Sequence, residues 1–307
     1  MKLAVIGAGM AGLTCGTRLR EAGHVVRLFD KGRGPGGRMA SRRADVDGET
    51  LRFDHGAQYF TVLDDRFRRQ VEAWEKAGIA APWPAAKDGA WVGTPAMNAP
   101  IKAMADVAEV TFGARIEGIA RDGEQWMLDG AEGRFDAIVV AVPAEQVGAL
   151  VDPHNPDFAA LAHRTVSDPC WTVMVAFDGR VDHEDTIRGG DVIGWAARDS
   201  AKPRREGSEC WVVQASPEWS REYLEEEAGG IAPLLLEHFA DNIGTALPPV
   251  RHVAAHRWRY ARCGDAGEGA LWDADKRLGL CGDWLLGPRV ECAYLSGLGL
   301  ADRIGTA

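Results

Sequence analysis

The stretch from Lys2 to Asp30, K-L-A-V-I-G-A-G-M-A-G-L-T-C-G-T-R-L-R-E-A-G-H-V-V-R-L-F-D, decides the fold of the N-terminal region. A short apolar run ends in the glycine pattern G-x-G-x-x-G, a helical pattern rich in Ala, Leu and Arg follows, and a second apolar run ends in Asp30. This succession predicts a β–α–β unit that binds dinucleotide phosphates at its helix N-terminus. The Asp30 carboxylate would bind a ribose hydroxyl, and a solvated strand end is the alternative interpretation.

The glycines of this pattern have a physical role in such a site. Because they carry no Cβ, the backbone can approach a pyrophosphate closely, and the free N–H groups of the first helical turn can bind its oxygens. We therefore expect the first loop to contact the dinucleotide through Gly7, Gly9, Met10, Ala11 and Gly12.

The nine residues after Asp30, K-G-R-G-P-G-G-R-M, add a second glycine turn and further cations beside the same carboxylate. Such a loop would wrap around the phosphates a second time, which favours FAD over NAD as the dinucleotide. Further cofactor contacts are therefore expected from Lys31, Gly37, Arg38 and Met39.

Two distant segments also favour FAD. The segment D-H-G-A-Q-Y-F at Asp54–Phe60 places small residues and an amide where a flavin ring could lie, and C-G-D-W at Cys281–Trp284 precedes a helix predicted to begin near Arg289. The partial positive charge of that helix N-terminus suits the flavin N1/O2 edge, which becomes anionic on reduction. These segments and the middle of the chain add the expected contacts Gly56, Ala57, Gln58, Ile116, Asp283, Arg289, Val290 and Glu291.

The composition argues against several other classes of function. The 307 residues carry a formal net charge of −10, which disfavours nucleic acid or an acidic membrane as a partner. No apolar run reaches the ~18 residues of a membrane helix, and a chain that begins on a strand leaves no room for a signal peptide. Six scattered cysteines predict neither a disulfide framework nor a metal site and fit a cytoplasmic location. FAD is expected to be non-covalent, with a link through Cys281 or Cys292 as the alternative.

The remaining patterns predict an interleaved α/β architecture. The apolar runs Asp136–Val142 and Arg277–Asp283 are typical of buried parallel strands that return to the first sheet. Ala114–Ala120 also has a strand-like pattern. Helices are expected at Asp64–Ala77 with Asp64 as the N-cap, at Ala96–Met104, at Glu218–Asn242 with an interruption near Gly229–Gly230, and at Val290–Ile304.

This order predicts two domains. A discontinuous Rossmann-type FAD-binding domain is expected to comprise residues 1–63, 100–150 and 261–307. A second, α+β domain that binds the substrate is expected to be inserted between these segments and to comprise residues 64–99 and 151–260.

Six motifs are distributed over nearly the whole chain: I-G-A-G-M-A-G-L (6–13), L-F-D-K-G-R-G-P-G-G-R-M (28–39), D-H-G-A-Q-Y-F (54–60), W-V-G-T-P-A-M (91–97), H-R-W-R-Y-A (256–261) and C-G-D-W-L-L-G-P-R-V-E-C-A-Y-L-S-G (281–297). Taken together, they resemble the motifs of the bacterial renalases. His55 and Cys292 stand where this resemblance leads us to expect Met and Gly.

Renalases are FAD enzymes of the amine-oxidase-like flavoprotein class, so the resemblance implies a substrate domain floored by a mixed β-sheet. It also implies a dinucleotide substrate, a 2- or 6-dihydro isomer of NAD(P)H that is oxidised to NAD(P)+. O2 would then reoxidise the flavin and give H2O2. The alternatives are an amine oxidase or a desaturase of the same fold, and a flavin-binding protein without turnover.

The implied hydride transfer to flavin N5 needs alignment of the donor carbon rather than a general base, so no catalytic side chain beyond the flavin is expected. His256 and Trp258 would share one face of an alternating strand, with His256 either facing the substrate or satisfied structurally. For each tryptophan, core packing is the alternative to a place in the pocket. The pocket candidates are Gln58, Tyr59, Trp91, Trp195, Trp211, His256, Trp258 and Trp284.

The sequence also contains two clusters of basic residues. Arg42–Arg43 is expected to be a solvated face. A basic strip after Trp195 is expected to be a solvated loop, with contact to the phosphates of a dinucleotide substrate as the alternative. This strip comprises Arg198, Lys202, Arg204 and Arg205.

Overall fold

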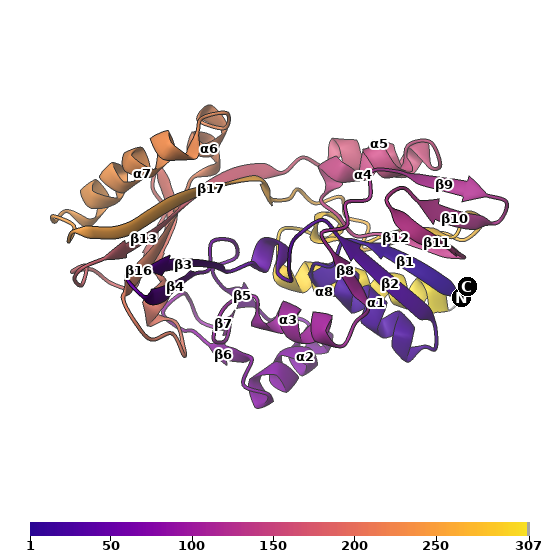
Figure 1. Cartoon of the computed structure of the whole chain (residues 1–307), viewed down its shortest axis with the longest axis horizontal. Coiled ribbons are helices and arrows are strands. Elements are labelled where there is room, and N and C mark those ends of the chain that lie inside the picture. The colour runs from indigo at the N-terminus through magenta and orange to yellow at the C-terminus, as the bar shows by residue number, and fades with distance from the viewer. Residues whose placement is uncertain (306–307) are drawn as a thin grey trace.

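The computed structural model describes residues 1–305, which form two lobes (Figure 1). The first lobe is built on a six-stranded sheet in the order β18-β19-β12-β1-β2-β8. Five strands are parallel, and β18 pairs antiparallel with β19 at one edge. The strands are β1 (Lys2–Ile6), β2 (Val25–Asp30), β8 (Val110–Phe112), β12 (Ala137–Val140), β18 (Leu271–Asp273) and β19 (Leu278–Leu280).

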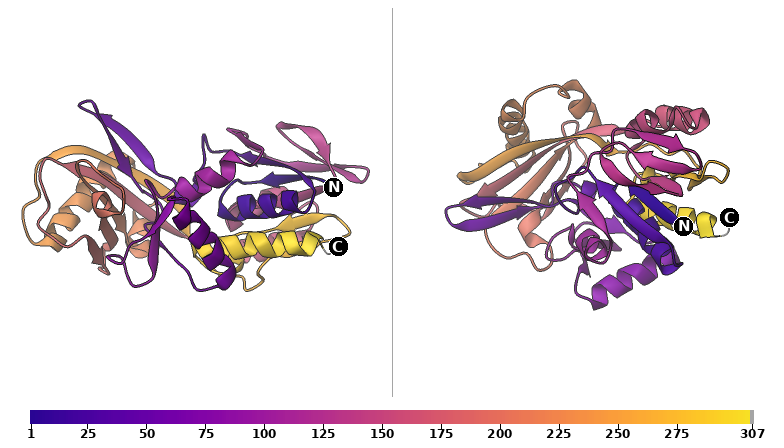
Figure 2. Two further views of the ribbon diagram at one scale, coloured as in Figure 1. Left: turned by 90° about the horizontal axis from the view of Figure 1, so that it is seen from below. Right: turned by 45° about the vertical axis from the view of Figure 1, so that its right-hand side comes forward.

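Both faces of this sheet are covered. Helices α1 (Met10–Glu21) and α8 (Val290–Gly305) lie side by side on one face and share a core with α2 (Asp65–Lys76) and α3 (Ala99–Asp106) (Figure 2). The other face packs against two helices and a small antiparallel sheet. These elements are α4 (Ala144–Val151), α5 (Pro156–Arg164), β9 (Ile119–Asp122), β10 (Gln125–Leu128) and β11 (Ala131–Phe135).

The second lobe is built on a five-stranded antiparallel sheet in the order β14-β15-β16-β13-β17. Two helices cover one face, and the β3–β4 hairpin packs on the other face through Leu51 and Phe53 (Figure 1). The elements are β3 (Arg42–Val46), β4 (Glu49–Phe53), β13 (Asp168–Phe177), β14 (Thr186–Arg188), β15 (Ile193–Arg198), β16 (Glu209–Ala215), α6 (Pro217–Glu222), α7 (Ala228–Ile243) and β17 (Val250–Arg262). A further, three-stranded sheet of β5 (Phe60–Thr61), β7 (Ala90–Gly93) and β6 (Ala80–Pro82) lies beside α2.

The predicted α/β fold class is confirmed, as are the two returning parallel strands, now β12 and β19. The mixed sheet is the six-stranded one, since every ladder of the five-stranded sheet is antiparallel. Asp64 is the N-cap of α2, and its carboxylate accepts the Arg66 N–H at 2.8 Å. The predicted C-terminal helix is α8.

Three expectations about secondary structure were wrong. The helix expected at Ala96 begins at Ala99, because Pro100 occupies its first turn, where proline fits. Most of Ala114–Ala120 forms no strand. The N–H groups of Gly113 and Ala114 donate to the carbonyls of Gly32 and Asp30, and the next strand, β9, begins only at Ile119. The helix expected at Glu218–Asn242 breaks at 223–227, where the Glu225 carboxylate turns to Arg259 at 2.6 Å, and both glycines lie in the first turn of α7.

Among residues 1–305, no helix has the length and apolar character needed to cross a membrane.

Candidate functional site

The loop between β1 and α1 has the geometry of a phosphate-binding turn. Gly7 has φ +103°, and a Cβ on Gly12 would collide with the Gly7 carbonyl oxygen, so both positions require glycine. A Cβ on Gly9 would meet nothing within 4 Å, so the loop faces open space there. Helix α1 has no side-chain N-cap and no acidic residue in its first turn, which leaves its N–H groups free for an anion.

The second glycine turn lies against the first. Gly37 has φ +53°, and a Cβ placed on it would lie 3.8 Å from the Cα of Gly9. Met39 is buried in the core beneath, and the Arg38 guanidinium pairs with the Asp283 carboxylate at 2.6 Å. The two glycine turns and the C-terminal segment around Asp283 therefore meet in the first lobe.

Asp30 ends β2 beside these turns. Its carboxylate accepts the Ala8 N–H and the Gly32 N–H, each at 2.7 Å. The chain at 113–114 bonds to the backbone of Asp30 and Gly32, which brings the buried Ile116 to the same edge of the sheet. Lys31 extends toward α4, where its ammonium donates to Gln146 at 2.9 Å.

The segment D-H-G-A-Q joins the two lobes. The Ala57 N–H donates to the Arg38 carbonyl at 2.8 Å, and a Cβ on Gly56 would collide with that same carbonyl. From the second lobe, the Gln214 amide donates to the Gly56 carbonyl and the Trp258 indole to the His55 carbonyl, each at 2.8 Å. The segment is thus held from both sides and can serve as the floor of a site between the lobes.

The C-terminal helix closes the first lobe. A Cβ on Gly297 would collide with the Ala11 carbonyl oxygen, so α8 approaches α1 with no space for a side chain between them. Glu291 is buried and accepts the Leu63 and Asp64 N–H groups at 2.6 and 2.8 Å. Arg289 pairs with Glu291, so these two side chains have protein partners beside Val290, where α8 begins.

The basic strip is largely buried, which contradicts the solvated loop expected from the sequence. Lys202 is 2% exposed, and its ammonium lies 2.7 Å from the Asp199 carboxylate and 3.2 Å from that of Asp54. Arg205 pairs with the same two acids. Arg198 is 1% exposed and pairs with Glu209 at 2.6 Å. Of the four residues, only Arg204 keeps an exposed side chain, and it donates to the Gly78 carbonyl at 2.8 Å.

Charge complementarity makes this burial possible. Burial would raise the pKa of Asp54, but the charges of Lys202 and Arg205 outweigh it and lower that pKa to about 2. Burial and the neighbouring Asp54 carboxylate raise the pKa of Asp199. The sequence analysis did not assign Asp54 or Asp199 to this network. The i,i+3,i+6 spacing of Asp199, Lys202 and Arg205 is a local signal for the pairing of these three residues, because it places one acid and two cations at turn spacing, but it does not report Asp54.

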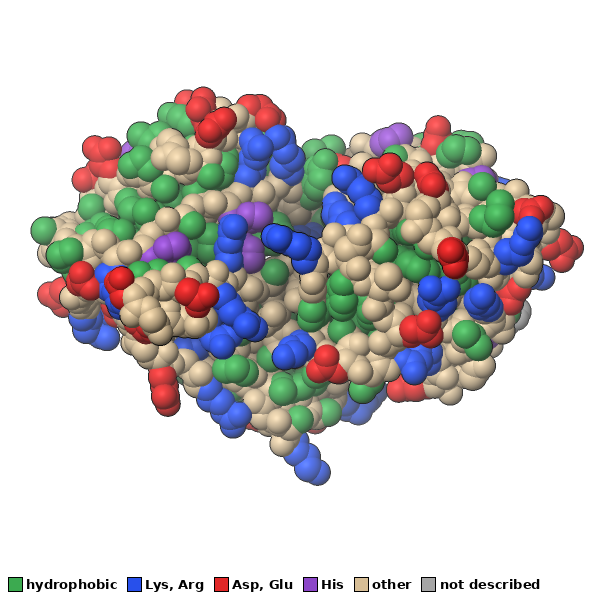
Figure 3. Space-filling view, in the orientation of Figure 1, with side chains coloured by type: hydrophobic (Ala, Val, Ile, Leu, Met, Phe, Trp, Pro, Cys, Tyr) green, Lys and Arg blue, Asp and Glu red, His purple; other side chains and the backbone are tan. Residues whose placement is uncertain are grey.

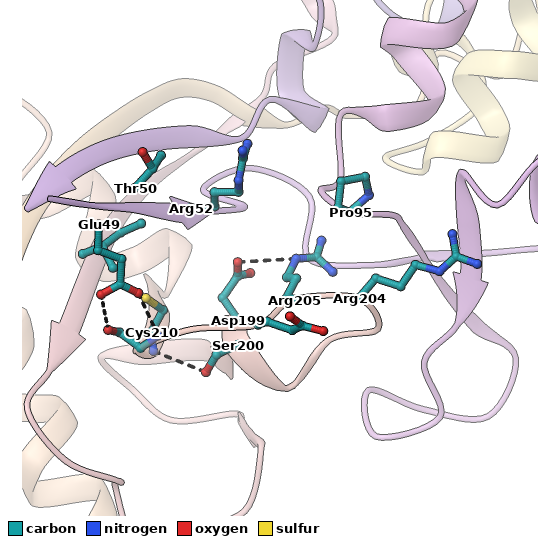
Figure 4. Close-up of a pocket in the computed structure, with 12 residues that line it drawn as sticks. Glu49, Thr50, Arg52, Pro95, Asp199, Ser200, Arg204, Arg205 and Cys210 are labelled. Carbon is teal, nitrogen blue, oxygen red and sulfur yellow. Dashed lines mark hydrogen bonds and ion pairs between the residues drawn. The ribbon is translucent and has the colours of Figure 1, made fainter.

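This network of ion pairs also holds the side chain of Gln58, which the sequence predicts to line the substrate pocket. The Gln58 side-chain amide donates to the carbonyls of Asp54 and Gly56, and its oxygen accepts the Lys202 ammonium at 3.2 Å. Behind the network, a cavity of about 150 Å³ opens under the β3–β4 hairpin, with Asp199 and Arg205 at its wall (Figure 4). No residue of either glycine turn lines this cavity, so it is separate from the phosphate-binding loops.

The aromatic candidates fall into three groups. Tyr59 packs on Trp195 with ring centroids 5.4 Å apart, and Trp91 of β7 lies in the neighbouring sheet. His256 and Trp258 share one face of β17, as predicted, with centroids 4.6 Å apart. For Trp211 and Trp284 the core alternative holds, since they are 0% and 1% exposed.

His55 lies beside this second aromatic group. Its ring contacts His256 at 4.9 Å and Trp258 at 5.1 Å between centroids. Burial, followed by the charges of His256 and Arg42, lowers the pKa of His55 to about 4. The ring is therefore neutral at pH 7. Figure 3 shows Lys, Arg and His side chains around the hollow between the lobes.

Two sequence profiles match the chain. Residues 5–74 match an NAD(P)-binding Rossmann-like domain, and residues 85–305 match the flavin containing amine oxidoreductase family. Because the second match covers most of the chain, the chain belongs to the flavin containing amine oxidoreductase family. With the open, uncapped glycine turns described above, which fit a dinucleotide, this family defines an FAD-dependent oxidoreductase.

Individual relatives agree with this class. The chain is 47% identical over 45 residues to a 4,4'-diapophytoene desaturase (4,4'-diaponeurosporene-forming) of Staphylococcus aureus (strain Newman). That match covers 15% of this chain and 9% of the desaturase, so the chain spans less than a tenth of the length of this curated relative.

Two solved structures share the fold over the whole chain. A protein of Exiguobacterium sp. 255-15 assigned as a protoporphyrinogen oxidase has a TM-score of 0.76 at 12% identity, over 99% of this chain and 98% of its own. A putrescine oxidase double mutant has a TM-score of 0.66 at 14% identity, over 100% and 99%. At these identities the likeness shows the fold alone.

Proposed function

We propose that the protein oxidises isomeric dihydronicotinamide dinucleotides, 2- or 6-dihydro-NAD(P), to NAD(P)+. The observation that carries this proposal is the charge of the hollow between the lobes, where cations and neutral imidazoles gather (Figure 3). An anionic dinucleotide is attracted to such a surface, whereas an amine, which is a cation at neutral pH, is repelled. The resemblance to renalases supports the same substrate class.

FAD, when bound, supplies the hydride acceptor N5 and passes both electrons to O2, so that substrate, O2 and one proton give NAD(P)+ and H2O2. The protein's part is to bind and align. The N–H groups of the first turn of α1 would hold the pyrophosphate, and Asp30 the adenosine ribose. The proposed cofactor contacts are Gly7, Gly9, Met10, Ala11, Gly12, Asp30, Lys31, Gly37, Arg38, Met39, Gly56, Ala57, Gln58, Ile116, Asp283, Arg289, Val290 and Glu291.

The substrate ring would be aligned by Gln58, Tyr59 and Trp195. The Gln58 amide is fixed by three hydrogen bonds, and Tyr59 and Trp195 provide flat apolar surface on which a dihydropyridine can stack. The nearest acids, Asp54 and Asp199, are held in ion pairs with Lys202 and Arg205. This arrangement suits hydride transfer, which needs no general base.

We also propose a domain organisation and a cellular location. The FAD-binding domain would comprise residues 1–63, 100–150 and 261–307, with the rest of the chain binding substrate. A cytoplasmic location is supported by six cysteines that form no disulfide.

The test is anaerobic stopped-flow mixing of the oxidised holoenzyme with 2- and 6-dihydro-NAD(P). We expect rapid bleaching of the flavin band near ~450 nm by at least one isomer. Putrescine and benzylamine are the comparison substrates. Oxidation of an amine is the second candidate, favoured by the family and by the likeness to a putrescine oxidase. Bleaching by an amine but by neither dihydropyridine would establish it and reject the first.

A further inference from the structure

The burial of the basic strip leaves the phosphate groups of a dinucleotide substrate without the partners that the sequence suggested. Arg198, Lys202 and Arg205 are already paired with acids inside the protein. Another cation, Arg42, is neither buried nor paired with an acid of the described chain. Arg42, at the start of β3, is exposed, and within residues 1–305 its guanidinium has no hydrogen bond and no acidic partner.

The charge of Arg42 acts on three histidines, His55, His252 and His256. The partner of Arg42 in the hairpin ladder is Phe53, whose ring stacks on His252 with centroids 5.9 Å apart. His256 follows His252 by four residues on β17 and therefore lies on the same face of that strand. His256 in turn contacts His55. The hairpin, the edge strand and the D-H-G-A-Q segment thus bring one guanidinium and three imidazoles to one place.

The electrostatics of this group favour the binding of an anion. Burial and the Arg42 charge lower the pKa of His252 and of His256. Within residues 1–305, the acid that acts on these rings is Asp54, which raises the pKa of His55 against burial, His256 and Arg42. The Nδ1 atom of His55 is buried without a hydrogen-bond partner. A bound anion would remove the repulsion and accept the free donors.

We infer that Arg42, His252 and His256, backed by His55, form the binding site for the phosphate groups of the dinucleotide substrate. This inference rests on the proposed function. The site lies on the second lobe, whereas the glycine turns proposed to hold the phosphates of FAD lie on the first. His55 precedes Gln58 by three residues, so the Cα atoms of the residue that backs the anion site and of the proposed ring-site residue lie at most about 10 Å apart. A dinucleotide carries its phosphates one ribose away from its nicotinamide ring and can reach both.

Binding at this site is linked to protons. Since the free imidazoles are neutral above pH 7, a bound pyrophosphate would raise the pKa of His252 and His256 and favour their protonated forms. Affinity should therefore be highest at low pH and fall as pH rises through the pKa values of the complex. The charged and titratable groups that act on these rings are Arg42, His55 and, through His55, Asp54.

The test is isothermal titration of the oxidised holoenzyme with ADP-ribose, whose pyrophosphate keeps the same charge between pH 6 and 9. We expect Arg42→Met to raise the Kd about tenfold. The matched control is Arg43→Met, because Arg43 is the next residue of β3, is also exposed and points to the other face. Its Kd should stay within about twofold. Adenosine, which lacks phosphate, should bind both variants and the parent equally.

Two further measurements separate this inference from the proposed function. ADP-ribose binding should take up protons, and the double change His252→Gln and His256→Gln should abolish that uptake. Equal Kd values for the parent and both arginine variants would overturn the anion site, even if dihydro-NAD(P) reduces the flavin. Arg42-dependent binding of ADP-ribose without flavin reduction by any dihydropyridine would leave the anion site standing and reject the proposed substrate.

Discussion

The two lobes reach their functional geometry by different means. In the first, glycines at Gly7, Gly12, Gly37 and Gly297 allow backbone to meet backbone, and the uncapped main-chain N–H groups of α1 are the groups proposed to bind phosphate. In the second, charged side chains far apart in sequence are brought together and neutralise one another. The first lobe therefore depends on where side chains are missing, and the second on which side chains pair. We therefore expect an added Cβ to disrupt the first lobe and a removed charge to destabilise the second.

The largest effect is expected at the glycine turn. Gly12→Ala places a Cβ against the Gly7 carbonyl, so the first lobe should lose its fold and its FAD. Gly9→Ala meets no protein atom, so the apoprotein should keep its unfolding midpoint and lose FAD affinity alone, because the Cβ enters the space proposed for phosphate. FAD content and urea unfolding measure both. Gly299→Ala, also in open space but on α8, is the control that should retain FAD, and equal FAD retention by Gly9→Ala would contradict the phosphate site.

The ion network should give the next largest effect. Lys202→Met leaves two buried carboxylates with one cation fewer, which should lower the free energy of unfolding by about 3–5 kcal/mol. It should also slow flavin reduction, because the Gln58 amide loses the donor that fixes it. The exposed Lys87→Met is the control and should change stability by no more than about 0.5 kcal/mol. A loss below about 1 kcal/mol in Lys202→Met would mean that the network is not structural.

A smaller effect is expected from His55. Its pKa of about 4 in the folded protein lies below its ordinary value of 6.5, so folding favours the neutral ring. The stabilisation is complete above pH 6.5 and is lost as pH falls toward 4, by about 2 kcal/mol between pH 7.5 and pH 5. His55→Met should remove this part of the pH dependence of urea unfolding, whereas His163→Gln, a change at an exposed histidine, should not. Identical pH profiles for parent and His55→Met would refute the assignment.

The smallest effect is expected at the N-cap of α2. Asp64→Ala removes the carboxylate that accepts the Arg66 N–H, which should cost about 1 kcal/mol of unfolding free energy. Asp65→Ala removes a neighbouring acid that caps nothing and acts through the helix dipole and an exposed ion pair with Arg68 at 3.6 Å, so about 0.5 kcal/mol or less is expected. Equal losses from both variants would show that charge, and not capping, sets the stability of this helix start.

These differences also explain which features could be predicted from the sequence. The glycine turn, the parallel strands and the Asp64 cap depend on short-range patterns, and the structure contains them where they were expected. The network of Asp54, Lys202 and Arg205 depends on partners about 150 positions apart, which no local pattern reports. A run of basic residues has the same sequence pattern whether its side chains are solvated or paired with acids. The break at 223–227 similarly depends on a distant strand, since Glu225 binds Arg259.

The packing of α8 on α1, without a side chain between Gly297 and Ala11, has a consequence for biosynthesis. Strand β19 and α8 are synthesised more than 240 residues after Asp30, yet they pair with the sheet and cover the helix that begins at residue 10. During vectorial translation the first β–α–β unit therefore emerges long before its packing partners. Until residues 278–305 leave the ribosome, the nascent chain holds its cofactor loop on an incomplete core, so we expect stable flavin binding only after these residues have emerged.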